Sequence, residues 1–295
     1  MSIFITGASG LVGKELSKHF NSQDIHVQAI KRLKSNEIDS PTWNYQDLIK
    51  NTDESPDVVI QLAGENIASK RWSQAQKNKI YNSRVQGTKN LVEQILKSKS
   101  LPSAFICASA IGYYGDRGGE TLTESSSAGH QFVSEICKDL EAETLPLKER
   151  GVRVINLRFG VILSSEGGSL NKILLPFKLG IGGKVGRGDQ YFSWVSIKDV
   201  VKSLEFCIKT PKLNGPVNIV APNPVTNEVF SKALAKSLNR PAIFPMPALM
   251  AKLAFGEMAT ELLLSGQKVY PQKLMDNGYE FAYPELDSAL NSIIN

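Results

Sequence analysis

The 295-residue sequence is poor in cysteine, in histidine and in long apolar runs. Its three cysteines, Cys107, Cys137 and Cys207, are too few and too scattered for a disulfide framework, which indicates free thiols in a reducing compartment. The three histidines do not have the spacing of metal ligands. No apolar run approaches the roughly 20 residues of a membrane span, and no secretory signal precedes the first apolar segment. We therefore expect a cytoplasmic protein without a metal site or a membrane contact.

The chain also lacks a large excess of either positive or negative charge. The sequence has 34 Lys and Arg against 29 Asp and Glu, a net charge of +5. Without a dense basic run there is no indication of nucleic-acid binding, whereas a mild positive charge suits a small anionic ligand. The oligomeric state is open between monomer and homodimer.

Short apolar segments alternate with helical patterns through the first half of the chain. Because the segments are rich in Val and Ile and apolar on both faces, they are typical of buried parallel strands separated by crossover helices. The expected strands are residues 3–6, 25–30, 58–62, 104–108 and 152–157, and the expected helices are 11–21, 74–97 and 131–148.

A change of texture after Leu163, to glycine-rich loops and later prolines, predicts a second lobe. We expect a main domain over 1–163 and a smaller lobe over 164–295, built from two insertions at about 164–191 and 222–295. Strands at 192–197 and 217–220 are expected to return to the main sheet. The longest lobe helix is expected at 248–264, and its apolar residues are predicted to form lobe core: Leu249, Met250, Leu253, Met258, Leu262 and Leu263.

The stretch IFITGASGLVG, residues 3–13, reads as strand, turn and helix with glycines at 7, 10 and 13. Such a turn lets the backbone approach a pyrophosphate, which then sits at the positive end of the helix dipole. It predicts an α/β fold with a Rossmann-type doubly wound parallel sheet. The expected cofactor contacts in this turn are Gly7, Ser9, Gly10, Leu11, Val12 and Gly13.

Two cations at the end of the second expected strand indicate which dinucleotide is bound. NAD-binding proteins place an acidic residue there, but this chain has Lys31 and Arg32, and the next acid is Glu37. A guanidinium can hold a 2′-phosphate through two charge-assisted hydrogen bonds. The prediction is that the domain over 1–163 binds NADP(H) and that the smaller lobe over 164–295 binds the substrate. The alternative is that both cations are only solvent-exposed side chains at the end of the strand.

Further motifs follow the glycine turn along the chain: LAGENIASKRW, NSRVQGTKNLVE, ASAIGYYGD, LPFKLGIGGKVGRGDQYFSW, GPVNIVAPNPVTNEVF and LLSGQKVYPQKLMDNGYEFAYPEL. Together with FITGASGLVG they resemble the extended short-chain dehydrogenase/reductase superfamily, and more closely its atypical branch of epimerase-family proteins with a C-terminal domain of unknown function. The resemblance implies that NADP lies against Leu62, Ala63 and Gly64. It also places Arg84 where most members carry asparagine, so that Arg84 either reaches a cofactor phosphate or forms a salt bridge across its helix.

The catalytic Tyr-x-x-x-Lys pair that this resemblance implies is absent. The tyrosine position falls on Phe132 or Val133, and the lysine position on residue 136 or 137, which are isoleucine and cysteine. No tyrosine in the chain is followed four residues later by lysine. Ser109, next to the usual Ser/Thr position, and Tyr113 remain as candidate catalytic residues, with Tyr113 as a general acid.

Aromatic and cationic residues from three stretches are candidates for one substrate pocket. Such a group suits an anionic, planar or nucleotide-linked small molecule, although each residue alone also fits a core or surface role. The candidates are Arg71, Trp72, Lys172, Gln190 and Trp194.

Three functions remain open at this point. The first is an NADP(H)-dependent oxidoreductase of atypical mechanism, and the second is a non-catalytic NADP(H)-binding protein that reports redox state. An ordinary sugar-nucleotide epimerase is third, because the proton relay is missing.

Overall fold

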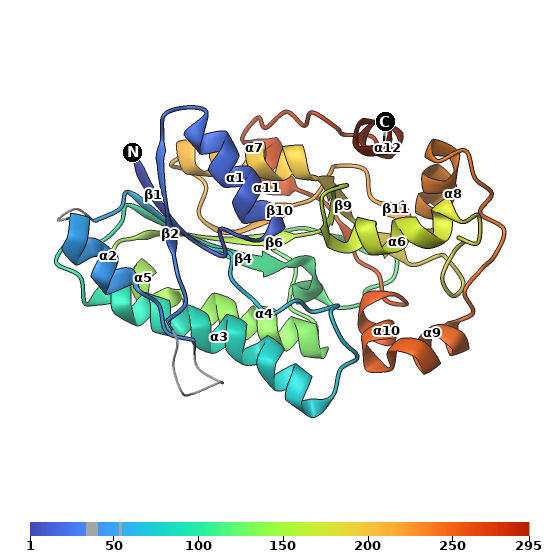
Figure 1. Ribbon diagram of the computed structural model, residues 1–295, viewed down its shortest axis with the longest axis horizontal. Coiled ribbons are helices and arrows are strands. Elements are labelled where there is room, and N and C mark those ends of the chain that lie inside the picture. The colour runs from blue at the N-terminus through green and yellow to red at the C-terminus, as the bar shows by residue number, and fades with distance from the viewer. Residues whose placement is uncertain (34–40, 53–54, 295) are drawn as a thin grey trace.

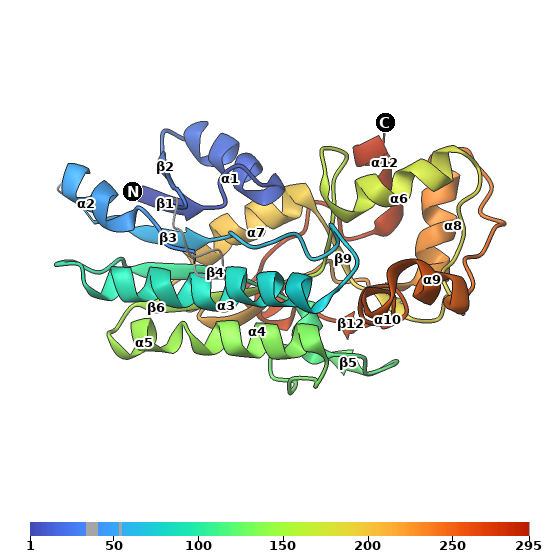
Figure 2. The ribbon, with the colours of Figure 1, turned by 60° about the horizontal axis from the view of Figure 1, so that its bottom comes forward.

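The computed structural model describes residues 1–33, 41–52 and 55–294 of the chain. It has a central sheet covered by helices on both faces, and a second group of helices at one end of that sheet, as Figures 1 and 2 show. Glu37 lies outside the described residues.

The central sheet has six strands in the order β10-β6-β4-β3-β1-β2, and every neighbouring pair is parallel. From β1 the chain goes first to β2 on one side and then to β3 on the other, so the strand order reverses at β1. Ligands of open α/β sheets bind outside the carboxyl ends of the strands at such a point. The strands are β1 (Ser2–Thr6), β2 (His26–Ile30), β3 (Val58–Gln61), β4 (Ala104–Ala110), β6 (Arg153–Phe159) and β10 (Gly215–Ile219).

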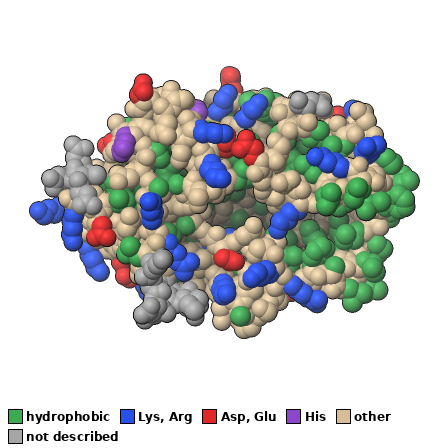
Figure 3. Space-filling view, viewed as in Figure 1, with side chains coloured by type: hydrophobic (Ala, Val, Ile, Leu, Met, Phe, Trp, Pro, Cys, Tyr) green, Lys and Arg blue, Asp and Glu red, His purple; other side chains and the backbone are tan. Residues whose placement is uncertain are grey.

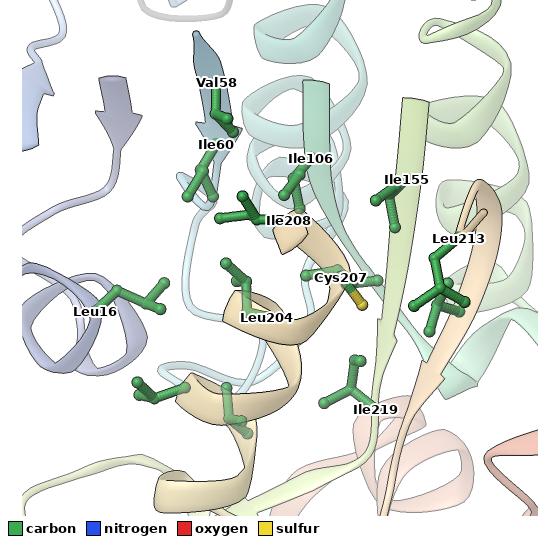
Figure 4. Packing of buried hydrophobic residues seen from close by; sticks show 14 of the residues in the cluster. Leu16, Val58, Ile60, Ile106, Ile155, Leu204, Cys207, Ile208, Leu213 and Ile219 are labelled. Carbon is green, nitrogen blue, oxygen red and sulfur yellow. The ribbon is translucent and has the colours of Figure 1, made fainter. Parts of the chain in front are cut away.

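Two helical layers bury the two faces of the sheet. On one face, α1 (Leu11–Asn21) and α7 (Ile197–Lys209) pack their apolar residues onto the Val and Ile side chains of the strands, as Figure 4 shows for Leu16, Leu204 and Ile208. The other face is covered by helices that share a second cluster containing Trp43, Ile80 and Leu140. They are α2 (Tyr45–Thr52), α3 (Gln74–Leu96), α4 (Phe132–Ala142) and α5 (Leu145–Glu149).

The second group of helices lies beyond the carboxyl ends of the strands. Leu174 and Phe177 from the first inserted segment pack in a third cluster with Phe230 and Leu290 from the second, so the two segments share one core. The helices of this lobe are α6 (Gly168–Lys178), α8 (Asn227–Ser237), α9 (Ala248–Phe255), α10 (Glu257–Leu262) and α12 (Leu286–Ile294). The short α11 (Gln272–Asp276) contacts β10 instead.

The expectation that residues 192–197 return to the main sheet is wrong, whereas 217–219 of the expected strand 217–220 do return, within β10. The segment forms two short strands in small sheets of their own, because it pairs with the stretches that follow β6 and β10. Val161 donates to the Ser193 carbonyl at 2.9 Å, and Ala221 donates to the Trp194 carbonyl at 2.6 Å. The pairs are β8 (Tyr191–Phe192) with β11 (Val225–Thr226), β9 (Trp194–Ser196) with β7 (Val161–Leu163), and β5 (Thr121–Leu122) with β12 (Lys268–Val269).

Two expected helices are each divided in the structure. The helix expected at 131–148 ends at Ala142, and a new helix begins at Leu145 with Pro146 in its first turn, where a missing N–H costs no hydrogen bond. The helix expected at 248–264 is divided into α9 and α10 by Gly256, which has a φ of 63°.

The prediction that the apolar residues of 248–264 form lobe core is wrong for α9. Leu249, Met250 and Leu253 are 69%, 57% and 63% exposed. Met258 of α10 is buried, but it packs in the second cluster, beside α3 and α4, and not in the lobe core. Among the described residues, no helix is both long enough and apolar enough to cross a membrane.

Candidate functional site

The turn after β1 requires glycine at two of its three glycine positions. Gly7 has a φ of 69°, and a Cβ atom there would lie 2.9 Å from the Ala63 nitrogen. A Cβ atom at Gly13 would lie 2.3 Å from the Gly7 oxygen, so helix α1 can pack this close to the turn only without a side chain. At Gly10 the nearest atom would be the Gly7 oxygen at 3.3 Å, and the space beyond it is open.

A cavity of about 500 Å³ opens beside this turn, at the carboxyl ends of β1, β3 and β4. Figure 3 shows the molecule hollowed between the sheet and the lobe. Seven of the residues expected to contact the cofactor line the cavity: Gly7, Gly10, Leu11, Val12, Gly13, Leu62 and Arg84.

The other expected cofactor residues lie around this cavity but do not line it. Ala63 and Leu62 donate backbone hydrogen bonds to the Thr6 hydroxyl, which fixes the loop after β3 against the end of β1. Thr6 also pairs with Ile30, the last residue of β2, so the exposed Lys31 and Arg32 follow directly beside the glycine turn. Ser9 and Gly64 are exposed.

Arg84 extends from α3 toward the loop after β3. A Cβ atom at Gly64 would lie 3.1 Å from its guanidinium carbon, so the glycine lets the arginine lie under the loop. Arg84 Nη1 donates to the Glu65 carbonyl at 2.8 Å and to the Ile80 carbonyl at 3.4 Å. Within the described part of the chain no carboxylate forms a salt bridge with Arg84, so the alternative of a salt bridge across its helix is not observed. Burial lowers the pKa of Arg84.

The amino end of α4 closes the cavity at the position where the sequence lacks a tyrosine. Val133 lines the cavity, and a Cβ atom at Gly112 would lie 2.4 Å from its Cγ1, so the two residues pack closely. Phe132 points to Trp72, with ring centroids 5.3 Å apart. The helix therefore presents apolar side chains here.

A carboxylate from the lobe lies at this same helix end. Glu261 of α10 accepts hydrogen bonds from the Phe132 and Val133 nitrogens, one on each oxygen, both at 3.1 Å. Gln131 Nε2 donates to the Ser265 hydroxyl at 3.4 Å. Glu261, Gln131, Ser265, Gln267 and Ser169 all line the cavity, so its polar side chains come mainly from the lobe.

Ser109 and Tyr113 lie on the opposite side of the strand end. Successive side chains of β4 point to opposite faces, so Ala108 and Ala110 line the cavity and Ser109 does not. The Ser109 hydroxyl donates to Glu141 Oε1 at 2.8 Å. The ring of Tyr113 lies on a guanidinium, with Cζ of Arg158 3.4 Å from its centroid.

That guanidinium belongs to a buried ionic network. Arg158 donates to both oxygens of Glu141, at 2.9 and 2.8 Å, and to the hydroxyl of Tyr114 at 3.0 Å. Although burial alone would lower the pKa of Arg158, the Glu141 carboxylate raises it, and burial raises the pKa of Tyr114 to about 12. The Tyr114 hydroxyl donates in turn to Asn218, so the network ties β4, α4, β6 and β10 together.

The expected substrate residues do not converge on the cavity. Trp72 is buried and donates to the Ile67 carbonyl, and Trp194 is buried in the lobe core. Gln190 Nε2 donates to the carbonyls of Val185 and Leu263, and Arg71 donates to the Leu253 carbonyl. Lys172 lines a neighbouring cavity of about 380 Å³ and donates to the Ala68 carbonyl.

Only weak signals in the sequence point to the polar side chains that line the cavity. Glu261 is a carboxylate in the apolar stretch 257–264, and Ser265 and Gln267 flank a glycine. A Cβ atom at Gly266 would lie 2.4 Å from the Tyr191 nitrogen, so this glycine holds both neighbours in place. Among the residues that the structure describes, no group of three or more His, Cys, Asp or Glu is arranged to hold a metal ion.

Comparison with known proteins gives matches over nearly the whole chain. Residues 3–220 match the family model described as the NAD dependent epimerase/dehydratase family, and residues 246–293 match a domain of unknown function, DUF1731. An epimerase family protein of Mycobacterium bovis is 37% identical over 98% of this chain and 96% of its own length. The epimerase family protein YfhF of Bacillus subtilis is 33% identical over 100% and 98%. The crystal structure of the human epimerase family protein SDR39U1 with NADPH superposes with a TM-score of 0.89 at 29% identity, covering 99% of each chain.

Proposed function

Because this chain belongs to the NAD-dependent epimerase/dehydratase family, we propose that it is an NADP(H)-dependent oxidoreductase or epimerase-like enzyme of atypical mechanism. The observation that carries the proposal is the make-up of the cavity. One wall is the glycine turn and Arg84, and the other is a set of polar side chains from the lobe. A protein that only binds a dinucleotide has no need of the second wall.

The residues at the strand ends fit a dinucleotide. Helix α1 begins at Leu11 without a side-chain cap, so its first N–H groups are available to a pyrophosphate beside Gly10. Arg84, which forms no salt bridge among the described residues, adds a cation to the same cavity. We propose NADP(H) over NAD(H) because Lys31 and Arg32 follow β2 beside the turn. The human relative crystallised with NADPH supports this choice.

The bound nicotinamide would supply hydride transfer, and the residues of this chain would orient the substrate and handle its proton. We assign that second role to the Glu261 carboxylate. Each of its oxygens accepts one backbone N–H and keeps a further lone pair, and the side chain lines the cavity. Held in this way, it would accept a hydrogen bond or a proton from a substrate hydroxyl, with Gln131 and Ser265 beside it.

Isotope transfer tests this proposal. Incubation with stereospecifically deuterated NADPH and a metabolite extract is expected to move label into a product. The Glu261→Gln variant keeps an acceptor oxygen for the helix end but cannot take up a proton, so label transfer should fall about a hundredfold or more while NADPH binding is retained. Glu257→Gln is the matched control, because that carboxylate is exposed and pairs with Lys77. Equal transfer by the Glu261→Gln variant and the wild type would remove Glu261 from the mechanism.

A second candidate function is a non-catalytic NADP(H)-binding protein, and the apolar character of the α4 end favours it. Tight NADPH binding without label transfer by the wild type would support that function instead. For either function we propose a reducing, cytoplasmic setting, which the three buried free cysteines support.

A further inference from the structure

The lobe carries a large apolar surface. Fourteen large hydrophobic residues are exposed in the described chain, and nine of them lie in the segments 175–181 and 243–253. Figure 3 shows hydrophobic side chains gathered over this end of the molecule. The nine residues, called here the apolar face, are Leu175, Leu179, Ile181, Ile243, Phe244, Met246, Leu249, Met250 and Leu253.

The two segments of the apolar face are joined by backbone contacts. Met246 donates to the Lys184 carbonyl and accepts from the Gly186 nitrogen, both at 2.8 Å. Phe244 donates to the Gly182 carbonyl at 3.3 Å. The nine side chains therefore belong to one continuous region of the lobe. They expose on the order of 900 Å², more than the few hundred Å² usual for an apolar patch on a monomer.

Helix α9 is the most exposed part of this face. Of its eight residues, ALMAKLAF, only Ala251 is buried and only Lys252 is charged. At about 100° per residue, Leu249, Leu253 and Met250 spread over roughly a quarter of the helix circumference, and the exposed Ala254 widens this arc. A helix with a broad apolar arc and a cation at its edge is typical of one that lies in a membrane interface.

The charge in and beside the apolar face is mainly positive, with one acid at each end of both segments: Glu166, Asp189, Glu228 and Glu257. Residues 167–188 and 229–256 contain eight Lys and Arg and no Asp or Glu. Four of the eight form salt bridges within the described chain: Lys184, Arg187, Lys232 and Lys236. The other four have no ion pair in the part of the chain that the structure describes: Lys172, Lys178, Arg240 and Lys252.

This positive charge favours one of two possible partners that could cover the apolar face. A second copy of the chain would bring cations against cations, which disfavours association. An anionic lipid surface would complement the basic border, at about 1 kcal/mol for each Lys or Arg near the headgroups, while the apolar side chains enter the interface. We propose that the apolar face docks the protein on the anionic surface of a lipid bilayer. The sequence alone predicted no membrane contact, and the contact proposed here needs no membrane-spanning segment.

Vesicle flotation tests the proposal. The full chain is expected to float with vesicles of phosphatidylcholine containing about one third phosphatidylglycerol, and not with phosphatidylcholine alone. Binding should weaken as the salt concentration is raised from about 0.05 to 0.5 M, because salt screens the headgroup attraction. Equal binding to both kinds of vesicle, or to neither, would overturn the proposal.

Two variants and a control make the test specific to this surface. The double variant Leu249→Gln/Leu253→Gln should reduce binding to the anionic vesicles at least about tenfold, and Lys178→Glu/Lys252→Glu should do the same. Leu145→Gln changes an exposed leucine of α5, away from the lobe, and should bind like the wild type. Thermal unfolding checks that each variant is folded. If the wild type instead forms a dimer in vesicle-free solution that Leu249→Gln/Leu253→Gln abolishes, the face is an interface between two copies and the lipid proposal is wrong.

Discussion

At the scale of the residue, Ser109 illustrates how a polar side chain at a strand end can serve the fold. Its hydroxyl donates to Glu141, and the same carboxylate accepts two hydrogen bonds from Arg158. Removing one hydrogen bond to a buried charge costs about 1.5–3 kcal/mol. Ser109→Ala should therefore lower the free energy of unfolding by about that amount in a denaturant titration, and should leave NADPH affinity nearly unchanged. Unchanged stability together with lost cofactor binding would contradict this account of the residue.

Glu124 gives a residue-scale prediction for pH. Burial raises the pKa of its carboxyl group, although Oε1 accepts hydrogen bonds from the Asn218 and Lys273 nitrogens. A carboxyl group whose pKa is raised on folding contributes stability at low pH, and this contribution is lost as the pH rises from about 4.5 through the folded-state pKa. Glu124→Gln should thus gain stability relative to the wild type on going from about pH 4 to pH 7.

The measurement is the difference in unfolding free energy between variant and wild type at the two pH values. Glu280→Gln, at an exposed position, is the control and should show little change in that difference. The difference in unfolding free energy between Glu124→Gln and the wild type could instead stay constant or move in the opposite direction. Either result would show that burial of this carboxyl group does not govern its titration.

At the scale of the element, two glycines of the turn between β1 and α1 are predicted to have different roles: Gly13 is needed for folding and Gly10 for cofactor binding. Gly13→Ala would place a methyl group 2.3 Å from the Gly7 oxygen and should disrupt the turn itself. Gly10→Val meets only the Gly7 oxygen at 3.3 Å, but its side chain extends into the cavity. Calorimetry should find Gly10→Val folded and without measurable NADPH binding, whereas Gly13→Ala should unfold at a lower temperature. A Gly10→Val protein with wild-type affinity would show that the cofactor lies elsewhere.

The helices and strands that the sequence predicted correctly are those that a local pattern of residues specifies. Helices α1 and α3 and the strands of the main sheet follow from apolar periodicity, and the β1 turn follows from its glycines. The division of the expected 248–264 helix at Gly256, and the pairing of β8 and β9 outside the main sheet, depend on contacts that no local pattern specifies.

At the scale of the whole molecule, the two walls of the cavity differ in how far the sequence predicts them. The glycine turn is a local motif, so its place at the sheet edge could be inferred. Glu261 meets the amino end of α4 from 129 positions along the chain, and its role depends on how the lobe packs. The aromatic residues expected in the cavity, Trp72 and Trp194, are used for packing, because a large apolar ring gains more from burial than from lining a wet cavity.

The central claim is that this cavity binds NADP(H), with the cations after β2 selecting the 2′-phosphate. Calorimetric titration with NADPH and with NADH tests it most directly. NADPH is predicted to bind at least about tenfold more tightly, a gap of about 1.4 kcal/mol, and Arg32→Ala should narrow the gap while NADH affinity stays nearly the same. Equal affinities for the two cofactors, or a preference for NADH, would contradict the claim.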